Sequence, residues 1–360
     1  MISRRPILIL VCGLAAGMTP SRAQTAAPAG VPAKVTVEQG ARDIVLVRRS
    51  GNEIQYRMPD APPGVTATLV RDQIKEVEFA ISVDMPKVHE AMRRRRWEQA
   101  VQLLLPSVDP LLDWLDLPEN NAVDPALLAG RCLAMAARDR KARGDSAGAD
   151  AIGRKAVDVA RSLRSADWHP DAASAHLRGV VVLVELGRLP DAERELARAR
   201  VPEIGDASYG MYGYARSRLL DARQNPREAL ESALGSMLYE NKDPESFPGA
   251  MLQAARSYEE VNEFYRARDV YFEVARLFRG TPAGRTARER LARLLEQGHT
   301  DAPETGNLAG VFFGTTEDLN KLCREFLAAT AGPETDDTPP ETEPTPAPAL
   351  AEPPQGVPAP

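Results

Sequence analysis

A short pattern built around one alanine recurs five times in this chain and limits the folds that it can adopt. The five alanines follow one another at intervals of roughly 40 residues: Ala100, Ala149, Ala192, Ala229 and Ala267. Five residues before the alanine, four copies carry a residue that tolerates a turn: Gly144, Gly187, Gln224 and Asn262. A period of this length is typical of stacked helical hairpins, each of which buries its apolar face against the next. We therefore expect a protein that binds a partner.

The stretch 35–82, which precedes the repeats, follows the period of strands. Residues 43–48 and 53–57 are apolar runs on either side of a turn that contains Gly51, which is a hairpin signal. Two further strands are expected at 66–70 and 74–81, where Val77 and Phe79 alternate with charged neighbours. These patterns predict a small β domain, either a curled sheet or an SH3-like barrel.

From residue 85 onward, apolar residues recur with a helical period, and large and small side chains occupy fixed places in each copy. Phe264, Ala267 and Tyr271 share one helical face in the fifth copy. In the preceding helix, Ala255 stands twelve residues before the aligned alanine and Tyr258 nine before it. This arrangement resembles the tetratricopeptide repeat over residues 84–297. The resemblance implies a mainly α fold, an α-solenoid of about five helical hairpins, with insertions at 118–124 and 165–170.

The segments around the repeats have compositions of their own. Residues 24–34 are rich in alanine and proline and predict a flexible leader. A helix over 283–296 with a polar side is expected to cap the array, and a further helix up to about residue 330 to pack back on it, so that 298–330 forms a C-terminal capping region. Residues 331–360 are rich in proline and glutamate and predict a disordered tail.

The first residues predict export. Arg4 and Arg5 precede an apolar stretch, and a small-x-small site ends at Ala23, so we expect a signal peptide over 1–23 and a periplasmic or secreted protein. Lipidation at Cys12 is a weaker alternative, because Cys12 lies inside the apolar stretch. No second stretch is long enough to span a membrane, so no integral span is expected after cleavage.

The sequence contains none of the common catalytic or nucleotide-binding motifs. There is no phosphate-binding loop, dinucleotide fingerprint or nucleophile elbow, and the four histidines have no metal-ligand spacing. We interpret the histidines as structural or surface residues, and Asp191, Glu193 and Glu195 as a solvated helix face. Cys132 and Cys323 are interpreted as small buried side chains, with a disulfide as the alternative. A net charge of −6 argues against general nucleic-acid binding. We expect no enzyme, metal or cofactor.

The resemblance also implies where a partner would bind, because the first helices of successive hairpins line the concave side of such arrays. Applied to this chain, the register of the repeat places Glu185 and Asp221 on the concave side, together with the candidate residues given below. Tyrosine and arginine are favoured anchors in interfaces, and the arginines and lysine are predicted to hold carboxylates of an extended ligand. The candidate partner-binding residues are Arg131, Arg138, Lys141, Met211, Tyr214, Arg218, Leu252 and Arg256.

The leading hypothesis is a non-catalytic exported scaffold or adaptor that binds a protein or peptide partner in the cell envelope. One alternative is an accessory subunit of a secretion, pilus or transport complex, and another is a hydrolase with a site between the β domain and the repeats. The arginine run 93–96 is interpreted as a solubilising turn, or else as a docking point for an acidic surface. The partner, the oligomeric state and the role of the tail are left open.

Overall fold

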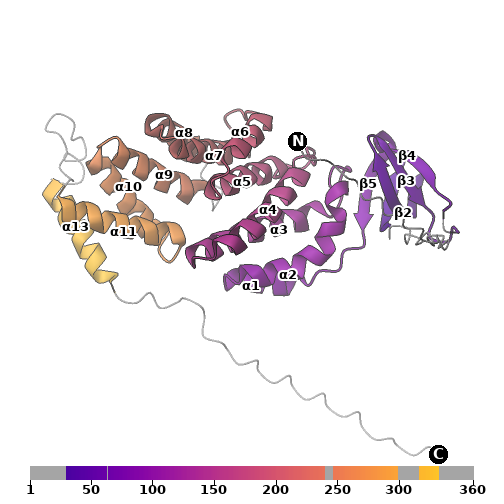
Figure 1. The fold of residues 1–360 in the computed structure, drawn as a ribbon, viewed down its shortest axis with the longest axis horizontal. Coiled ribbons are helices and arrows are strands. Elements are labelled where there is room, and N and C mark those ends of the chain that lie inside the picture. The colour runs from indigo at the N-terminus through magenta and orange to yellow at the C-terminus, as the bar shows by residue number, and fades with distance from the viewer. Residues whose placement is uncertain (1–29, 63, 240–245, 299–315, 332–360) are drawn as a thin grey trace, which may run out of the picture.

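The computed structural model describes residues 30–62, 64–239, 246–298 and 316–331. These residues form a mainly helical protein with a small N-terminal antiparallel sheet. The sheet lies at one end of the helical part, and helix α13 lies at the other (Figure 1). The predicted signal peptide and all but the first residue of the predicted tail lie outside the described residues.

The sheet has five strands in the order β4-β3-β2-β1-β5, all paired antiparallel. Its apolar face is buried by residues such as Val35, Leu46 and Ile54. The first strand begins inside the stretch 24–34 for which a leader is predicted, because Val31 already pairs with Leu46. The strands are β1 (Val31–Val37), β2 (Gly40–Ser50), β3 (Glu53–Arg57), β4 (Ala67–Val70) and β5 (Ile74–Phe79).

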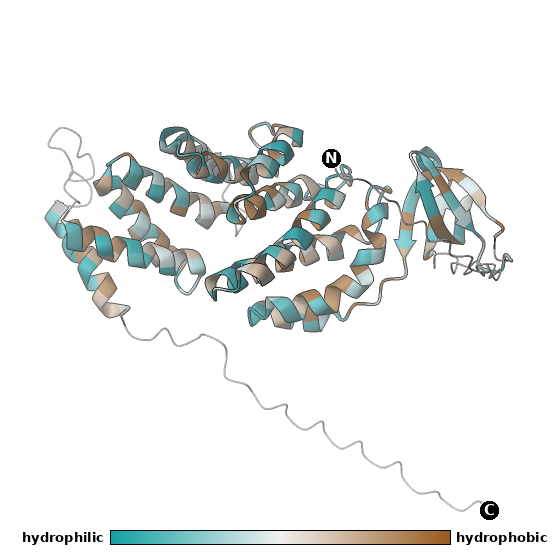
Figure 2. Ribbon diagram, in the orientation of Figure 1, coloured by the Kyte–Doolittle hydropathy of each residue, from teal (hydrophilic) through white to brown (hydrophobic). Residues whose placement is uncertain are grey.

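Consecutive helices contact each other in pairs. They are α1 (Met85–Arg93), α2 (Trp97–Val108), α3 (Val123–Ala142), α4 (Ser146–Leu163), α5 (Ala172–Glu185), α6 (Leu189–Arg198), α7 (Tyr209–Ala222), α8 (Pro226–Tyr239), α9 (Ser246–Glu260), α10 (Phe264–Leu277), α11 (Pro282–Gln297) and α13 (Thr316–Ala329). A short 3-10 segment, η2 (Asp109–Trp114), follows α2. Polar and apolar residues alternate along α3, α9 and α11, as expected of amphipathic helices (Figure 2).

All five hairpins turn through the same backbone geometry. The residue five before each aligned alanine has a positive φ in every copy, including the first, where Arg95 takes the place (φ 53°) and Gly144 is its equivalent in the second (φ 82°). The next N–H then donates to a carbonyl five residues earlier, as Arg188 does to Leu183 at 2.9 Å. This left-handed turn with a 6→1 hydrogen bond is the Schellman C-cap, which explains the preference for glycine and asparagine at this place.

The aligned alanines lie where the two helices of each pair meet. All five are buried; Ala149, the most exposed of them, has an exposed fraction of 2%. A larger side chain at this place would push the second helix away from the first, because buried cores tolerate added volume poorly. The small residue in the sequence pattern is therefore a packing requirement of the hairpin.

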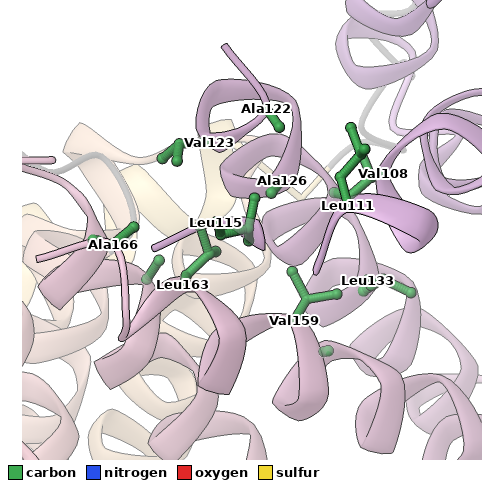
Figure 3. Close-up of a cluster of buried hydrophobic side chains, with 14 of the residues drawn as sticks. Val108, Leu111, Leu115, Ala122, Val123, Ala126, Leu133, Val159, Leu163 and Ala166 are labelled. Carbon is green, nitrogen blue, oxygen red and sulfur yellow. The ribbon is translucent and has the colours of Figure 1, made fainter. Parts of the chain in front are cut away.

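Buried apolar residues continue from one pair into the next. Figure 3 shows one such cluster, which includes Leu111 of η2, Leu115, Leu133 of α3 and Leu163 of α4. At the far end α13 packs on α11 as expected, with Cys323 buried beside the core and the Phe272 and Phe326 rings in edge contact at 5.4 Å. The structure thus has two cores, one that runs from the sheet through α7 to the start of α9 and one around α9 to α13.

The sheet is docked on the helices through the first predicted insertion. Asn121 accepts a hydrogen bond from the N–H of Phe79 at 2.8 Å and donates one to its carbonyl at 3.0 Å, so its amide extends the edge strand β5. Asp116 is buried and pairs with Arg49 and with Nε of Arg71, the latter at 3.1 Å. The contacts of Asn121 give the insertion a structural role, and Asp116, two residues before the insertion, adds ion pairs to the sheet.

Cys132 and Cys323 are both buried free thiols, and no disulfide joins them. Burial raises the pKa of each thiol to about 11, so neither is a reactive thiolate. In the part of the chain that the structure describes, no helix is both long and apolar enough to cross a membrane.

Candidate functional site

The first helices of successive pairs, α3, α5, α7 and α9, contact one another in order. The C-terminal ends of α3, α5 and α7 lie together at one edge of the array. There the structure forms a pocket of about 450 Å³. It is lined by three predicted site residues, Arg138, Lys141 and Arg218, together with Ala142, Val184, Glu185, Asp221 and Ala222. We call this the groove pocket.

One wall of the groove pocket is an ion pair between α3 and α5. Arg138 Nε donates to both carboxylate oxygens of Glu185, at 2.9 and 3.1 Å. Lys141 Nζ donates to the backbone carbonyl of Glu185, at the C-terminal end of α5. The predicted cations Arg138 and Lys141 are therefore already engaged by the protein, and Glu185 holds them at the wall.

The opposite wall is formed by Arg218 of α7, which is held differently. Its Nε is buried, and no hydrogen-bond partner for that atom lies among the described residues. Burial tends to lower the pKa of the guanidinium, but nearby Tyr214 and Glu185 outweigh this and the pKa is raised. Arg218 is therefore a fixed positive charge whose Nε has no partner in the described chain.

Arg256 of α9 repeats this situation one pair further along. Its Nε is likewise buried without a partner in the described part of the chain. Burial lowers the pKa of Arg256, and the charge of Arg218 lowers it further. The two guanidinium groups thus lie close enough to repel each other, with Asp221 as a nearby opposing charge.

The other predicted site residues, Arg256 included, do not line the groove pocket. Met211, Tyr214 and Leu252 are all buried, so they pack within the array and leave little surface for a partner. Tyr214 packs so tightly on α9 that a Cβ on Gly249 would come within 2.5 Å of its ring. Arg131 is half-buried on α3, about two turns before Arg138. Gly249 therefore lets α7 and α9 approach closely at Tyr214.

A second polar cluster lies at the other end of α5, and here the sequence interpretation was wrong in one respect. Glu195 was assigned to a solvated helix face, yet it is buried, with an exposed fraction of 3%. It accepts hydrogen bonds from His176 Nε2 at 3.1 Å, Arg161 Nε at 3.0 Å and Arg198 Nη1 at 3.1 Å. His176 is buried as well and belongs to the structural class predicted for the histidines.

The electrostatics of this cluster follow from that arrangement. Burial tends to raise the pKa of Glu195, but its hydrogen bonds with His176 and Arg161 outweigh this and lower it. For His176, burial lowers the pKa more than Glu195 raises it, which favours a neutral ring. The one signal in the sequence was the helical spacing that puts Glu195 three residues after Ala192, on the buried side of α6.

No group of three or more metal-ligating side chains occurs among residues 30–62, 64–239, 246–298 and 316–331. A scan against protein-family models finds no match to this chain, and no curated protein matches it either. The function is therefore argued from the geometry of the groove pocket.

Proposed function

We propose that this protein is a non-catalytic adaptor of the tetratricopeptide-repeat type, exported to the periplasm or secreted, whose groove pocket binds a protein or peptide partner. In this proposal the paired helices form an α-solenoid, and the ends of α3, α5, α7 and α9 face its concave side. The common turn geometry, the buried alanines and the succession of first helices support it.

The observation that carries the proposal is the pair of arginines, Arg218 and Arg256. Buried polar atoms are nearly always hydrogen-bonded, and one without a partner calls for an explanation such as a missing ligand. The cost of leaving a buried donor unsatisfied is substantial, and here two such donors lie near each other. Carboxylates of a bound peptide would satisfy both, because a guanidinium binds carboxylates in a planar, bidentate geometry.

The test compares the affinity-tagged protein with Arg218→Glu/Arg256→Glu in pull-down from an envelope extract, followed by mass spectrometry. The matched control is Arg216→Glu, on the same helix but exposed. We expect a partner that the parent and the control retain and the double variant loses, with unchanged circular dichroism. Capture of the same proteins by the double variant would refute the role of the groove pocket. Arg138 is a poorer target, since Arg138→Glu would also disturb Glu185.

A further inference from the structure

A second cavity, of about 510 Å³, lies away from the groove pocket. The end of α4, the first turns of α5, the end of α6 and the loop 199–208 surround it. It touches α5 at Ala172 to Leu177, whereas the groove pocket touches α5 at Val184 and Glu185. The two sites are therefore separated by about 15–20 Å along the helix. We call this the α5 N-terminal cavity.

Its polar lining combines basic and acidic side chains. Arg164, Arg198 and Arg200 reach it from three different segments, and His169 and His176 line it too. The acidic lining residues are Asp167 and Asp206. Asp206 pairs with Arg200 at 3.8 Å and accepts a hydrogen bond from the N–H of Glu203 at 2.9 Å.

The buried Glu195 fixes part of this lining. One carboxylate faces two guanidinium groups, Arg161 and Arg198, and a buried histidine. Glu195 thus anchors Arg198 at the cavity wall, while Arg161 also pairs with Asp158 at 3.6 Å. A buried anchor of this kind fixes the position of the Arg198 guanidinium, although Glu195 offsets part of its charge.

Arg164 is the one arginine of this lining that has no ion pair among the described residues. In the described part of the chain its guanidinium has no hydrogen bond or ion pair, although its charge reaches His176 and lowers the pKa of that ring. Beside it, the N-terminus of α5 has no side-chain cap, since Asp171 makes no capping hydrogen bond. The N–H groups of a first helical turn lack intrahelical partners and favour anions.

We propose that the α5 N-terminal cavity binds a small organic phosphate monoester, with its phosphate between Arg164, Arg198 and the first turn of α5. Three strong acceptor oxygens and a double charge match Arg164, unpaired in the described chain, the anchored Arg198 and the first-turn N–H groups of α5 beyond that of Ala172, which donates to the carbonyl of His169 at 3.2 Å. The cavity is within the size range of small-molecule sites and far larger than a phosphate ion needs. Its remaining walls include Leu177, Ala199 and Pro202, which suit a compact organic group.

The test is isothermal titration of the full chain with inorganic phosphate and with glycerol 3-phosphate, repeated for Arg164→Gln. The matched control is Arg154→Gln, an exposed arginine on the same helix that pairs with Asp150. We expect glycerol 3-phosphate to bind the parent more tightly than phosphate does, and Arg164→Gln to weaken it about tenfold or more, the scale of one lost charge-assisted contact. Arg154→Gln should bind as the parent does.

Two further measurements separate this proposal from its rivals. Arg218→Glu/Arg256→Glu should bind glycerol 3-phosphate normally, so this site can fail or succeed independently of the groove pocket. Sedimentation with phosphatidic acid vesicles tests a lipid headgroup as the source of the phosphate. The proposal is overturned if neither soluble ligand binds at millimolar concentration, if Arg164→Gln binds like the parent, or if only the vesicles bind.

Discussion

Replacing Arg256 by methionine should make the protein more stable while it weakens partner binding. In the folded state the Nε of Arg256 is buried without a partner in the described chain, and burial together with Arg218 lowers the pKa of the guanidinium. A lowered pKa means that the fold holds the charged form less well than the unfolded chain does. Methionine keeps most of the apolar stem and has no donor to satisfy.

The magnitude follows from the unsatisfied donor. Such a group costs about 1–3 kcal/mol, and methionine also removes the repulsion from Arg218. Against this, the attraction of Arg256 to Asp221 and Glu260 is lost. We expect a net gain of about 1 kcal/mol in the free energy of unfolding, equivalent to roughly 2–4 °C in Tm for a domain of 150–250 residues.

The assay is urea unfolding followed by both circular dichroism and tyrosine fluorescence, because repeat arrays can unfold in stages and two probes reveal this. Arg216→Met is the control and should stay within about 0.5 kcal/mol of the parent, as exposed substitutions do. A loss of 1 kcal/mol or more in Arg256→Met would show that the fold itself satisfies Arg256. The reasoning about the groove pocket would then fail.

Three other substitutions test separate parts of the structure. Asp116→Asn should lower the free energy of unfolding by about 1–3 kcal/mol and loosen the attachment of the sheet, because Arg49 and Arg71 lose their shared carboxylate. Hydrogen exchange at β5 and at residues 109–123 should become faster, and unchanged exchange would contradict the docking role. Gln224→Gly should stabilise by up to about 1 kcal/mol in urea unfolding, since a φ of 59° strains a side chain; a loss would refute it. His176, whose pKa burial lowers, contributes stability above about pH 6.5 that is lost as the pH falls, because the unfolded chain protonates first. His176→Gln should flatten this dependence in unfolding curves between pH 7 and pH 5, and an unaltered slope would contradict it.

The hairpins could be predicted because their determinants are local. A turn that needs a positive φ and an alanine that lets two helices touch leave marks a few residues apart, as Gly187 and Ala192 show. Arg95 illustrates the limit of this signal: it has the same backbone as the glycines, yet its identity alone suggested a departure from the pattern. The start of β1 was missed because the pairing of Val31 with Leu46 is not visible in a local alanine and proline composition.

The sites were harder to predict because they depend on contacts between distant segments. Arg138 and Arg218 line one pocket, but the sequence could not show that Glu185 already holds Arg138. The burial of Met211 and Glu195 depends on how closely neighbouring helices approach. That distance is set by glycines such as Gly213, where an added Cβ would come within 2.9 Å of Ser236.

The repeat register explains why arginines with an Nε unpartnered in the described chain lie in and beside the groove pocket. Arg138, Arg218 and Arg256 each stand eleven residues before the aligned alanine of their copies, so the fold brings equivalent arginines to one edge. Arg138 reaches Glu185, which stands seven residues before the alanine of the next copy. The equivalent of Glu185 for Arg218 is Glu260, which is exposed, and no ion pair between them is found in the described chain. The Arg138–Glu185 pair therefore shows the interaction with a carboxylate that Arg218 and Arg256 lack. A carboxylate supplied by a partner would give these two arginines the equivalent ion pair.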